Sequence, residues 1–500
     1  MTAPFSRTRI ATAVAGVALG LAGGQAFGSA FALAEQNVMG LGNAFAGAAA
    51  TAEDANTVWH NPAGLARLNF PQVEQAIHVI IPSAKFHNAN SQAALGQPLG
   101  GSGGDAGGAA FVPNLYGSMA INNQWHVGIG VNVPFGLKTD WDDGWLGRYQ
   151  ALKSEIKTIN VNPSVSYKVT DAFWLGAGAN YQHVQAELTN NVNYTAALAQ
   201  GYQTPPVSSL IPPAALPALI GATSGLDSFS KVTGDDYSWG WNVGLMYSFN
   251  GDPNIDVGAA RIGLAYRSKI KYDVRGTVNL CNPVAAGATP PPGCTPQTIP
   301  TLTGGLAPLN PVVAGVSNNI NTTRAYNGGV SVDLTMPDMA SLSYYQKLND
   351  KWDILGDVTW TGWSSIPELK IVRTDGPAAG ASTVLPENFK DTWRVSAGFN
   401  YQYNEKTVLR AGVAYDQSPV NDTDRSARLP DNDRTWLTIG GRFKYSTALN
   451  FDVGAAYIFV KDGSIDNSGN PASIAANGLI NGDFKSNVIV VSAQANYRWK

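Results

Sequence analysis

Most of the chain consists of stretches in which apolar and polar residues alternate, each followed by a turn or a loop. From about residue 70 onward these stretches run for roughly ten to fifteen residues, and a period of two predicts β-strands. Fourteen segments are expected to be strands, centred near residues 78, 116, 130, 161, 179, 243, 266, 334, 358, 398, 411, 440, 455 and 493.

The two faces of these segments differ in chemistry. Around residue 398, for example, Val395 and Phe399 share one face, while Arg394 and Asn400 share the other. Many segments end in Tyr, Trp or Phe, as lipid-facing strands flanked by aromatic girdles do. An even number of strands can close, and closure satisfies every backbone group in lipid. We therefore expect an all-β transmembrane barrel of 14 antiparallel strands over residues 70–500.

Composition agrees with a barrel and excludes a helical membrane protein. Charged residues make up 14% of the chain, against roughly 25% in soluble proteins. Beyond the N-terminal region, no stretch approaches the roughly 18 consecutive apolar residues of a membrane helix. The net charge of -3 gives no indication of a nucleic-acid partner.

The N-terminus has the features of a secretory signal. Two arginines precede an apolar run over residues 10–22, and Ala26-Phe27-Gly28 supplies a small-x-small cleavage site. We expect residues 1–28 to be a signal peptide and the mature chain to begin near Ser29, with cleavage after Ala26 as the alternative. An exported barrel belongs in the bacterial outer membrane, where its partners would be membrane lipid, lipopolysaccharide and the barrel assembly machinery.

Segments that do not alternate are expected inside the barrel or in loops. Residues 29–69 are rich in small residues and predict a compact, partly helical plug, or hatch, in the lumen. In the second of the long loops, residues 208–219 are apolar and either pack on themselves or form a surface that captures a ligand. Long extracellular loops are expected at about residues 88–110, 189–235, 278–325, 373–388 and 462–484.

The chain has two cysteines, Cys281 and Cys294, within a segment rich in Pro, Gly and Ala. In an oxidising compartment a disulfide that closes a surface loop is the natural interpretation. A catalytic thiol or a metal site would need nearby His or carboxylate residues, and these do not cluster there. No metal and no cofactor are expected.

Short motifs are distributed from end to end of the mature chain. The most specific is Asn61-Pro62-Ala63. The others are Gly40–Gly47 (GLGNAFAG), Pro134–Leu137 (PFGL), Gly147–Tyr149 (GRY), Pro337–Ala340 (PDMA), Trp352–Trp363 (WDILGDVTWTGW) and Leu409–Asp416 (LRAGVAYD). Together these motifs resemble the FadL family of outer-membrane transporters for long-chain fatty acids and other hydrophobic compounds.

The resemblance implies a fourteen-stranded barrel closed by a hatch, and diffusion-driven uptake without an enzymatic step. It implies that ligand is caught by the extracellular loops, moves to a pocket beside the hatch N-terminus, and leaves sideways where the third strand is kinked. Phe31 and Leu33 would then contact ligand, with packing inside the hatch as the alternative. Asn61, Pro62 and Ala63 are expected to shape a turn, with Asn61 bonded to backbone groups.

The third strand has residues suited to a lateral opening. Gly128, Gly130, Asn132 and Pro134 are expected to face inward, and Phe135 outward. Pro134 has no amide hydrogen and interrupts the ladder, while the glycines leave a notch beside the hatch. These five residues are our candidate opening, and an ordinary bulge near the strand end is the alternative.

Inward basic residues are candidates for binding a carboxylate. Residues 259–272 are expected to form one strand whose basic face comprises Arg261, Arg267, Lys269 and Lys271. An arginine facing lipid at mid-bilayer costs roughly 2 to 4 kcal/mol, so this face should look into the lumen or lie beyond the membrane edge. A buried fatty-acid carboxylate needs a cationic partner, which Arg261, Arg394 or Arg410 would provide. Pairing of these arginines with inward aspartates is the alternative.

Three other functions are compatible with a barrel. Uptake of aromatic hydrocarbons such as toluene would need no cation. A lipid hydrolase would need a nucleophile supported by a histidine, and none of His60, His78, His87, His126 and His183 lies in a recognisable catalytic motif. A general polar porin is disfavoured by the hatch. The barrel is expected to be a monomer.

Overall fold

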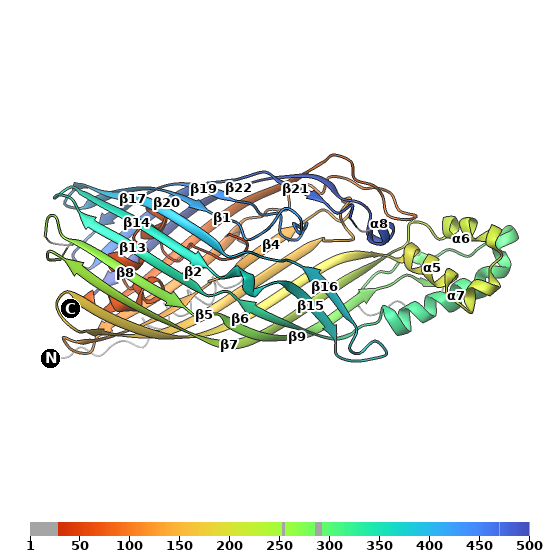
Figure 1. The fold of residues 1–500 in the computed structure, drawn as a ribbon, viewed down its shortest axis with the longest axis horizontal. Coiled ribbons are helices and arrows are strands. Elements are labelled where there is room, and N and C mark those ends of the chain that lie inside the picture. Colours follow the sequence, from red (N-terminus) through yellow and green to blue (C-terminus); the bar gives the residue numbers. More distant parts are fainter. Residues whose placement is uncertain (1–28, 253–255, 286–292, 470, 500) are drawn as a thin grey trace.

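The computed structural model describes residues 29–252, 256–285, 293–469 and 471–499, so the predicted signal peptide lies outside the described residues. One closed antiparallel barrel of 14 strands forms the molecule, which confirms the predicted fold class (Figure 1). The barrel closes where β1 (Gln72–Asn88) pairs with β22 (Asn481–Arg498) along its whole length. The uninterrupted strands between them are β2 (Ala110–Ala120), β5 (Lys153–Lys168), β6 (Phe173–Asn193), β7 (Asp227–Phe249), β17 (Thr392–Asn404), β18 (Thr407–Asp416), β19 (Arg434–Lys444) and β20 (Leu449–Val460).

Several positions in the wall are broken into two segments, so the sheet comprises 20 segments in all. The breaks separate β3 (Trp125–Asn132) from β4 (Gly136–Asp140), β8 (Ala260–Arg267) from β9 (Ile270–Cys281), β12 (Gly328–Met336) from β13 (Met339–Lys347), and β14 (Trp352–Thr361) from β15 (Glu368–Arg373). A 3-10 turn, η6 (Trp363–Ser365), lies in the last of these breaks. Two short strands, β16 (Ser382–Pro386) and β21 (Gly463–Asp466), extend the wall at the end that carries the long loops.

The outer surface has the apolar face that alternation predicts. Val395, Ile439 and Val491 are 51%, 66% and 52% exposed, whereas their polar neighbours along each strand are buried or half-buried inside. Aromatic side chains gather toward the strand ends, as in the contact between Trp352 and Tyr401, whose ring centroids lie 4.6 Å apart. This arrangement matches the lipid-facing band and aromatic girdle of an outer-membrane barrel.

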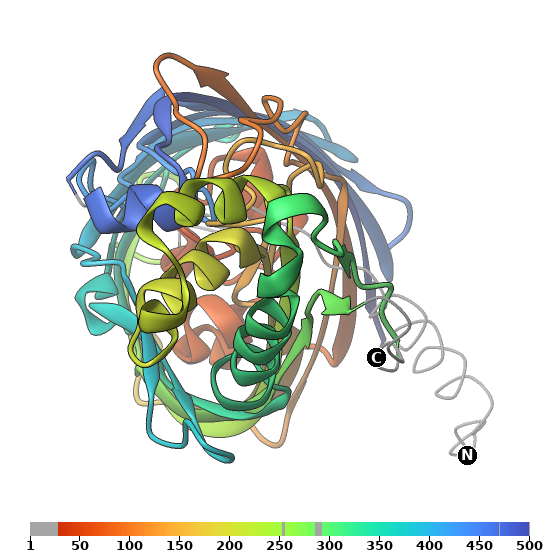
Figure 2. The same ribbon diagram turned by 90° about the vertical axis from the view of Figure 1, so that its right-hand side faces the viewer.

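The hatch lies within the lumen, where Figure 2 shows it through the mouth of the barrel. Its turns are short because small residues and positive-φ positions interrupt them, including Ala44, Phe45 and Ala52. They are α2 (Val38–Gly42), α3 (Ala48–Thr51), α4 (Thr57–His60) and the 3-10 helix η1 (Pro62–Arg67). No helix among the described residues is long and apolar enough to cross a membrane.

Helical loops form a cap at one end of the barrel (Figures 1 and 2). One loop carries α5 (Tyr194–Gln203), η2 (Val207–Leu210), η3 (Pro213–Ala215) and α6 (Leu216–Ala222), and the other carries η4 (Gly304–Leu309), α7 (Asn310–Asn319) and η5 (Ile320–Arg324). A further loop carries the short helix α8 (Pro471–Asn477). Because outer-membrane barrels have long extracellular loops and short periplasmic turns, the cap is the extracellular end.

The apolar run in the first cap loop packs with the second loop. Leu198, Leu219 and Val313 belong to one buried apolar cluster, which favours the self-packed interpretation for part of the run. The predicted loop over residues 189–235 was too long at both ends, since β6 continues to Asn193 and β7 starts at Asp227. Polar residues on both strands pair there beyond the apolar band, so loss of alternation did not mark the end of the strands.

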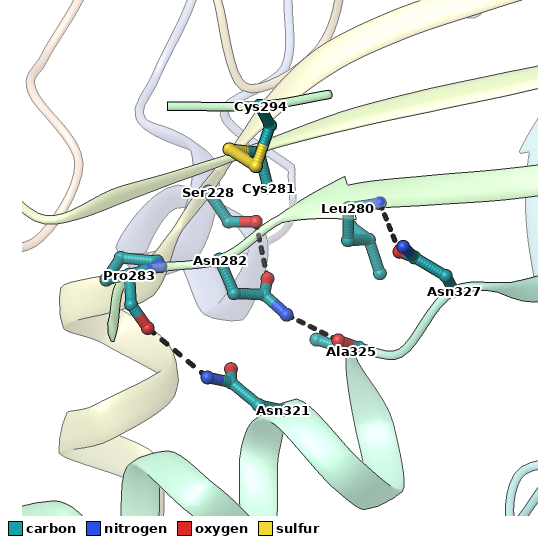
Figure 3. The surroundings of a disulfide bond; sticks show 9 residues. All are labelled: Ser228, Leu280, Cys281, Asn282, Pro283, Cys294, Asn321, Ala325 and Asn327. Carbon is teal, nitrogen blue, oxygen red and sulfur yellow. Dashed lines mark hydrogen bonds between the residues drawn. A yellow bond between two sulfur atoms is a disulfide. The ribbon is translucent and has the colours of Figure 1, made fainter. Parts of the chain in front are cut away.

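A disulfide joins Cys281 to Cys294, with their Cα atoms 5.8 Å apart (Figure 3). The neighbouring Asn282 accepts a hydrogen bond from Ser228 Oγ at 2.6 Å and donates one to the Ala325 carbonyl at 2.5 Å. The disulfide and these bonds hold the end of β9 against the second cap loop. Beside it lies a small parallel pair, β10 (Val284–Ala285) and β11 (Thr298–Ile299).

The expectation of one continuous strand over residues 259–272 is wrong. Ser268 and Lys269 separate β8 from β9, and the alternation changes phase between them. Arg261 and Arg267 point inward, but Lys269 and Lys271 are exposed on the outer surface. A single extra residue is enough for this reversal because side chains alternate with a period of two.

Candidate functional site: the hatch and its two cavities

Charged residues fix the periplasmic base of the hatch to the barrel wall. Glu53 lies 3.3 Å from both Arg410 and Arg442, and Asp54 pairs with Arg442 and, at 2.6 Å, with Arg498. Both arginines that contact Glu53 also pair with Asp452 of β20. Asp54 and Asp452, like Arg410 and Arg442, are buried, whereas Glu53 and Arg498 are half-buried. The buried charges depend on their partners, so the base of the hatch is tied to the wall.

The turn at Asn61, Pro62 and Ala63 docks on glycines of the wall. Asn61 donates from Nδ2 to the carbonyls of Ala49 and Leu245, at 2.8 and 3.0 Å, and accepts from the Ala63 amide. A Cβ atom at Gly244 would lie 2.0 Å from Asn61 Oδ1, so only glycine permits this approach. The triplet therefore forms a turn that holds the hatch against the wall, and Pro62 also lines a cavity.

The N-terminal end of the hatch completes the broken third strand. Leu33 donates its amide to the Pro134 carbonyl, and the Gly136 amide donates to the Phe31 carbonyl, both at 2.8 Å. Ala32 and Phe135 form an isolated bridge between them. Residues 31–33 thus occupy the edge that the break between β3 and β4 leaves open.

An apolar cavity lies on the extracellular side of Phe31. We call it the apolar cavity; its wall comes from β4, β5, β6, β7, β9, β12 and β15 and includes Leu137, Ile156, Val274, Leu334 and Leu369. Phe389 and Leu429, from segments that fold into the lumen, complete it. The lining therefore comes from the hatch N-terminus, the barrel wall and segments that fold into the lumen.

Glu387 and Arg428 are the two ionisable residues among the described residues that line the apolar cavity. Both lie in segments that connect strands. Burial raises the pKa of the Glu387 carboxyl to about 8, against the opposing effect of Arg428, and burial lowers the pKa of Arg428 to about 10. Near pH 7 the carboxyl is therefore largely neutral, while the guanidinium keeps its charge. The apolar cavity presents one net cation.

A second, more polar cavity lies on the other side of the hatch N-terminus, and we call it the hatch cavity. Its lining includes Leu33, Pro134, Arg267, Arg394 and Asp416, with several serines and threonines of β13, β14 and β17. An aromatic contact separates the two cavities. The ring of Phe31, which lines the apolar cavity, lies 4.7 Å from that of Trp363, which lines the hatch cavity.

The wall is weakened beside this point, on the β2 side of the third strand. Pairing of β2 with β3 stops at Leu115 and Val131, and β4 pairs with β5 alone among the described strands. The Val133 amide reaches only the Asn114 side chain, at 3.4 Å, and a small gap lies between the strands there.

Asn132 and Pro134 lie at this break, but three other candidates do not fit the predicted opening. Gly128 and Gly130 lie in the fully paired part of β3, where a Cβ would collide with Val58 of the hatch or with its neighbours. Phe135 is buried rather than outward, because the break reverses the alternation and turns its ring toward Phe31.

Comparison with known proteins agrees with this architecture. Residues 19–499 match the family model described as outer membrane protein transport protein (OMPP1/FadL/TodX). The chain belongs to the FadL family. It is 31% identical to the 47 kDa outer membrane protein of Pasteurella multocida, over 96% of this chain and 98% of that protein. It is 28% identical to the long-chain fatty acid transport protein of Escherichia coli O157:H7, over 91% and 92%.

A solved FadL homologue of Pseudomonas aeruginosa superposes with a TM-score of 0.76 at 25% identity, over 94% of this chain and 100% of that one. Membership of the FadL family identifies the chain as a multi-pass protein of the outer membrane. Members of this family are transporters and channels.

Within this member of the FadL family the three predicted cations have different environments. Arg410 is bound into the hatch base, as described above. Arg261 is fully buried, donates to the Thr51 carbonyl at 3.0 Å, and lies 3.7 Å from Asp252. Neither lines the apolar cavity or the hatch cavity. Arg394 does line the hatch cavity, where its nearest carboxylate is Asp357 at 3.9 Å.

Arg428 and Glu387 were missed because they lie outside the predicted strands. Glu387 lies in the predicted loop over residues 373–388, and Arg428 lies in the segment over residues 417–433, between two predicted strands. The backbone of residues 417–433, however, accepts hydrogen bonds from inward side chains. Trp141, for example, donates from Nε1 to the Ala427 carbonyl at 3.0 Å. The segment contains apolar residues, Val420 and Leu429, among charged ones that are also buried. This mixture of apolar and charged residues is the sequence signal that would have indicated a loop folded into the lumen.

One histidine is paired with a serine, as a hydrolase would require. His78 Nδ1 lies 2.7 Å from Ser492 Oγ. Among the described residues, His78 Nε2 has no hydrogen-bond partner, and the side chain is fully buried. The pair lacks the orienting acid and the access that a nucleophile needs, so it does not support a hydrolase.

Proposed function

We propose that this protein takes up long-chain fatty acids, or similar single-chain acids, across the outer membrane by passive diffusion. The observation that carries the proposal is the apolar cavity, which is lined by Phe31 at the hatch N-terminus and contains the Arg428 guanidinium. An alkyl chain suits the apolar wall, and a carboxylate in such a site needs a charged donor. The names of its fatty-acid-transporting relatives agree with this substrate class.

The proposed route runs from the helical cap into the apolar cavity, past Phe31 and Leu33, and into the hatch cavity. Movement of residues 31–33 would free the edges of β3 and β4. The ligand would then leave sideways at Asn132 and Pro134. No covalent step is part of this mechanism, and its driving force is the concentration gradient.

The test compares palmitate, hexadecanol and toluene as ligands of the purified protein and of an Arg428→Met variant. We expect palmitate to bind more tightly than hexadecanol, and the substitution to weaken palmitate about tenfold while leaving hexadecanol within about twofold. Arg324→Met, on the exposed cap, is the matched control and should change neither.

Equal binding of palmitate and hexadecanol, with no effect of Arg428→Met, would contradict the carboxylate site. A preference for toluene would instead identify an aromatic-hydrocarbon channel with the same route.

We also infer that residues 1–28 are a signal peptide, that the mature chain starts near Ser29, and that the barrel is inserted as a monomer by the assembly machinery among lipopolysaccharide. The position of the Ser29 side chain, which donates to the Gln417 carbonyl at 2.7 Å, supports a mature N-terminus inside the lumen. The intact mass of protein purified from outer membranes tests the cleavage site.

A further inference from the structure

A second discontinuity in the barrel wall lies far from the third strand. The register between β7 and β8 ends at Asn242 opposite Arg267, and the register between β7 and β9 begins only at Asp235 opposite Arg275. Between these limits no β-ladder joins residues 236–241 of β7 to residues 268–274 opposite them. We call this stretch the β7–β9 seam. On its other side β7 pairs with β6 without interruption.

Side chains replace part of the missing ladder in the seam. Ser268 Oγ accepts from the Trp241 amide at 2.9 Å, and Asp236 Oδ2 accepts from the Asp273 amide at 2.9 Å. Ile270 leans over Gly240, where a Cβ atom would lie 2.7 Å from Ile270 Cγ1. The Ser268 amide also donates to the Trp241 carbonyl at 2.9 Å, at the lower end of the seam. Beyond this bond the seam is held by the Asp236 side chain and by the packing of Ile270, so it opens at lower cost than a continuous β-ladder.

The hatch cavity reaches the wall at the lower end of this seam. Asn242, Tyr266 and Arg267, which mark the point where pairing stops, all line that cavity. The adjoining position is also broken, between β12 and β13. There Tyr266 donates from its hydroxyl to Asp338 Oδ2 at 2.7 Å. The hatch cavity therefore lies against the wall at the point where the pairing of β7 with β8 ends.

The outer rim of the seam has the chemistry of the membrane interface. Tyr237, Trp239 and Trp241 are 54%, 64% and 51% exposed, as residues of an aromatic belt are. Lys269, which directly precedes β9, and Lys271, within β9, are both exposed. Neither forms an ion pair within the part of the chain that the structure describes. Unpaired lysines beside an aromatic belt attract the anionic head of an amphipathic molecule whose tail lies in the membrane.

We propose that the β7–β9 seam is a second lateral port, through which an amphipathic single-chain anion held in the outer leaflet enters the hatch cavity. Lys269 and Lys271 receive its head group, Ile270 moves aside, and Arg267 and Arg394 meet the carboxylate inside. This inference rests on the proposed function, since it adds an entrance for the same class of substrate.

A disulfide across the seam tests the port. In the Gly240→Cys/Ile270→Cys variant the two side chains meet, and the oxidising compartment favours their bond. The uncrosslinkable reference is Gly240→Ser/Ile270→Ser. A control pair, Thr438→Cys/Ala456→Cys, bridges the fully registered β19–β20 seam. Palmitate uptake is measured in cells that lack their own transporter, and palmitate binding on the purified variants.

We expect the bonded seam to slow uptake at least about fivefold relative to the serine pair, with binding unchanged and uptake restored by a reductant. The β19–β20 bond should have no effect. Uptake equal to that of the serine pair would overturn the port, as would a parallel loss of binding and uptake. If the unmodified protein neither binds nor takes up palmitate, the proposed function itself fails.

The lysines provide a second measurement that does not depend on a new bond. Lys269→Gln/Lys271→Gln should slow palmitate uptake about threefold or more and leave hexadecanol uptake unchanged. The control is Lys157→Gln/Lys231→Gln, two outer lysines that already pair with Glu155 and Glu187 at 2.8 Å. An equal effect of both double variants, or none of either, would contradict a head-group role for Lys269 and Lys271.

Discussion

At the scale of single residues, the chemistry of the apolar cavity depends on the different ionisation of two neighbours. Because burial raises the pKa of Glu387 to about 8, its carboxyl gains a negative charge as the pH rises through that value. That charge would compete with a bound anion for Arg428. We expect affinity for an alkyl sulfonate, whose own charge is constant, to fall about tenfold between roughly pH 6.5 and pH 9.5.

The measurement is a binding titration of decanesulfonate at several pH values on the unmodified protein and on Glu387→Gln. The amide cannot ionise, so the variant should bind with the same affinity across this range. A fall of equal size in the variant would assign the pH dependence to another group.

Sequence reasoning could name inward arginines from alternation, but their partners on the hatch, such as Glu53 for Arg410, are separated by hundreds of residues and left no local signal.

At the scale of secondary-structure elements, the hatch segment over residues 31–33 acts as a short strand that closes the break in the third strand. Leu33→Pro removes the amide that donates to the Pro134 carbonyl, so we expect this end of the hatch to leave the wall more often. Hydrogen exchange at the Gly136 amide, which donates to Phe31, should become at least about tenfold faster.

Leu33→Ala is the matched control, because it shortens the side chain but keeps the amide. If both variants accelerate exchange at Gly136 equally, side-chain packing rather than the backbone bond holds the segment. If hydrogen exchange at the Gly136 amide is unchanged in Leu33→Pro, residues 31–33 do not close the break between β3 and β4.

The elements differ in how far the sequence determined them. Lipid on one side and a filled lumen on the other impose a period of two, so all 14 strand positions were predictable. Apart from the break at Pro134, the breaks in the strands were not predictable. Between β8 and β9, for example, one extra residue in the link formed by Ser268 and Lys269 exchanges the inward and outward faces, and composition gives no sign of it. The apparent basic face over residues 259–272 combined two strands of opposite phase.

At the scale of the whole molecule, the hatch is fixed at its base and can release at its N-terminal end. Asp54 pairs with both Arg442 and Arg498, and its loss would leave the buried Arg442 and the half-buried Arg498 with fewer partners. Breaking a buried pair in this way costs roughly 3 to 5 kcal/mol. We expect Asp54→Asn to loosen the base and to produce a steady conductance in planar bilayers, whereas the unmodified barrel should remain closed.

Asp171→Asn is the control, since the exposed Asp171 side chain pairs with Lys168 of the same turn, and its loss should leave the bilayer current unchanged. A large steady current through the unmodified protein would mean that the hatch does not seal the lumen, as in a general porin. If Asp54→Asn stays closed while palmitate uptake continues, the base is held by its remaining contacts, including Asn61, and transport requires movement of the N-terminal end alone. Lateral passage through the wall needs a sealed lumen, because an open axial channel would give small polar solutes a direct path to the periplasm.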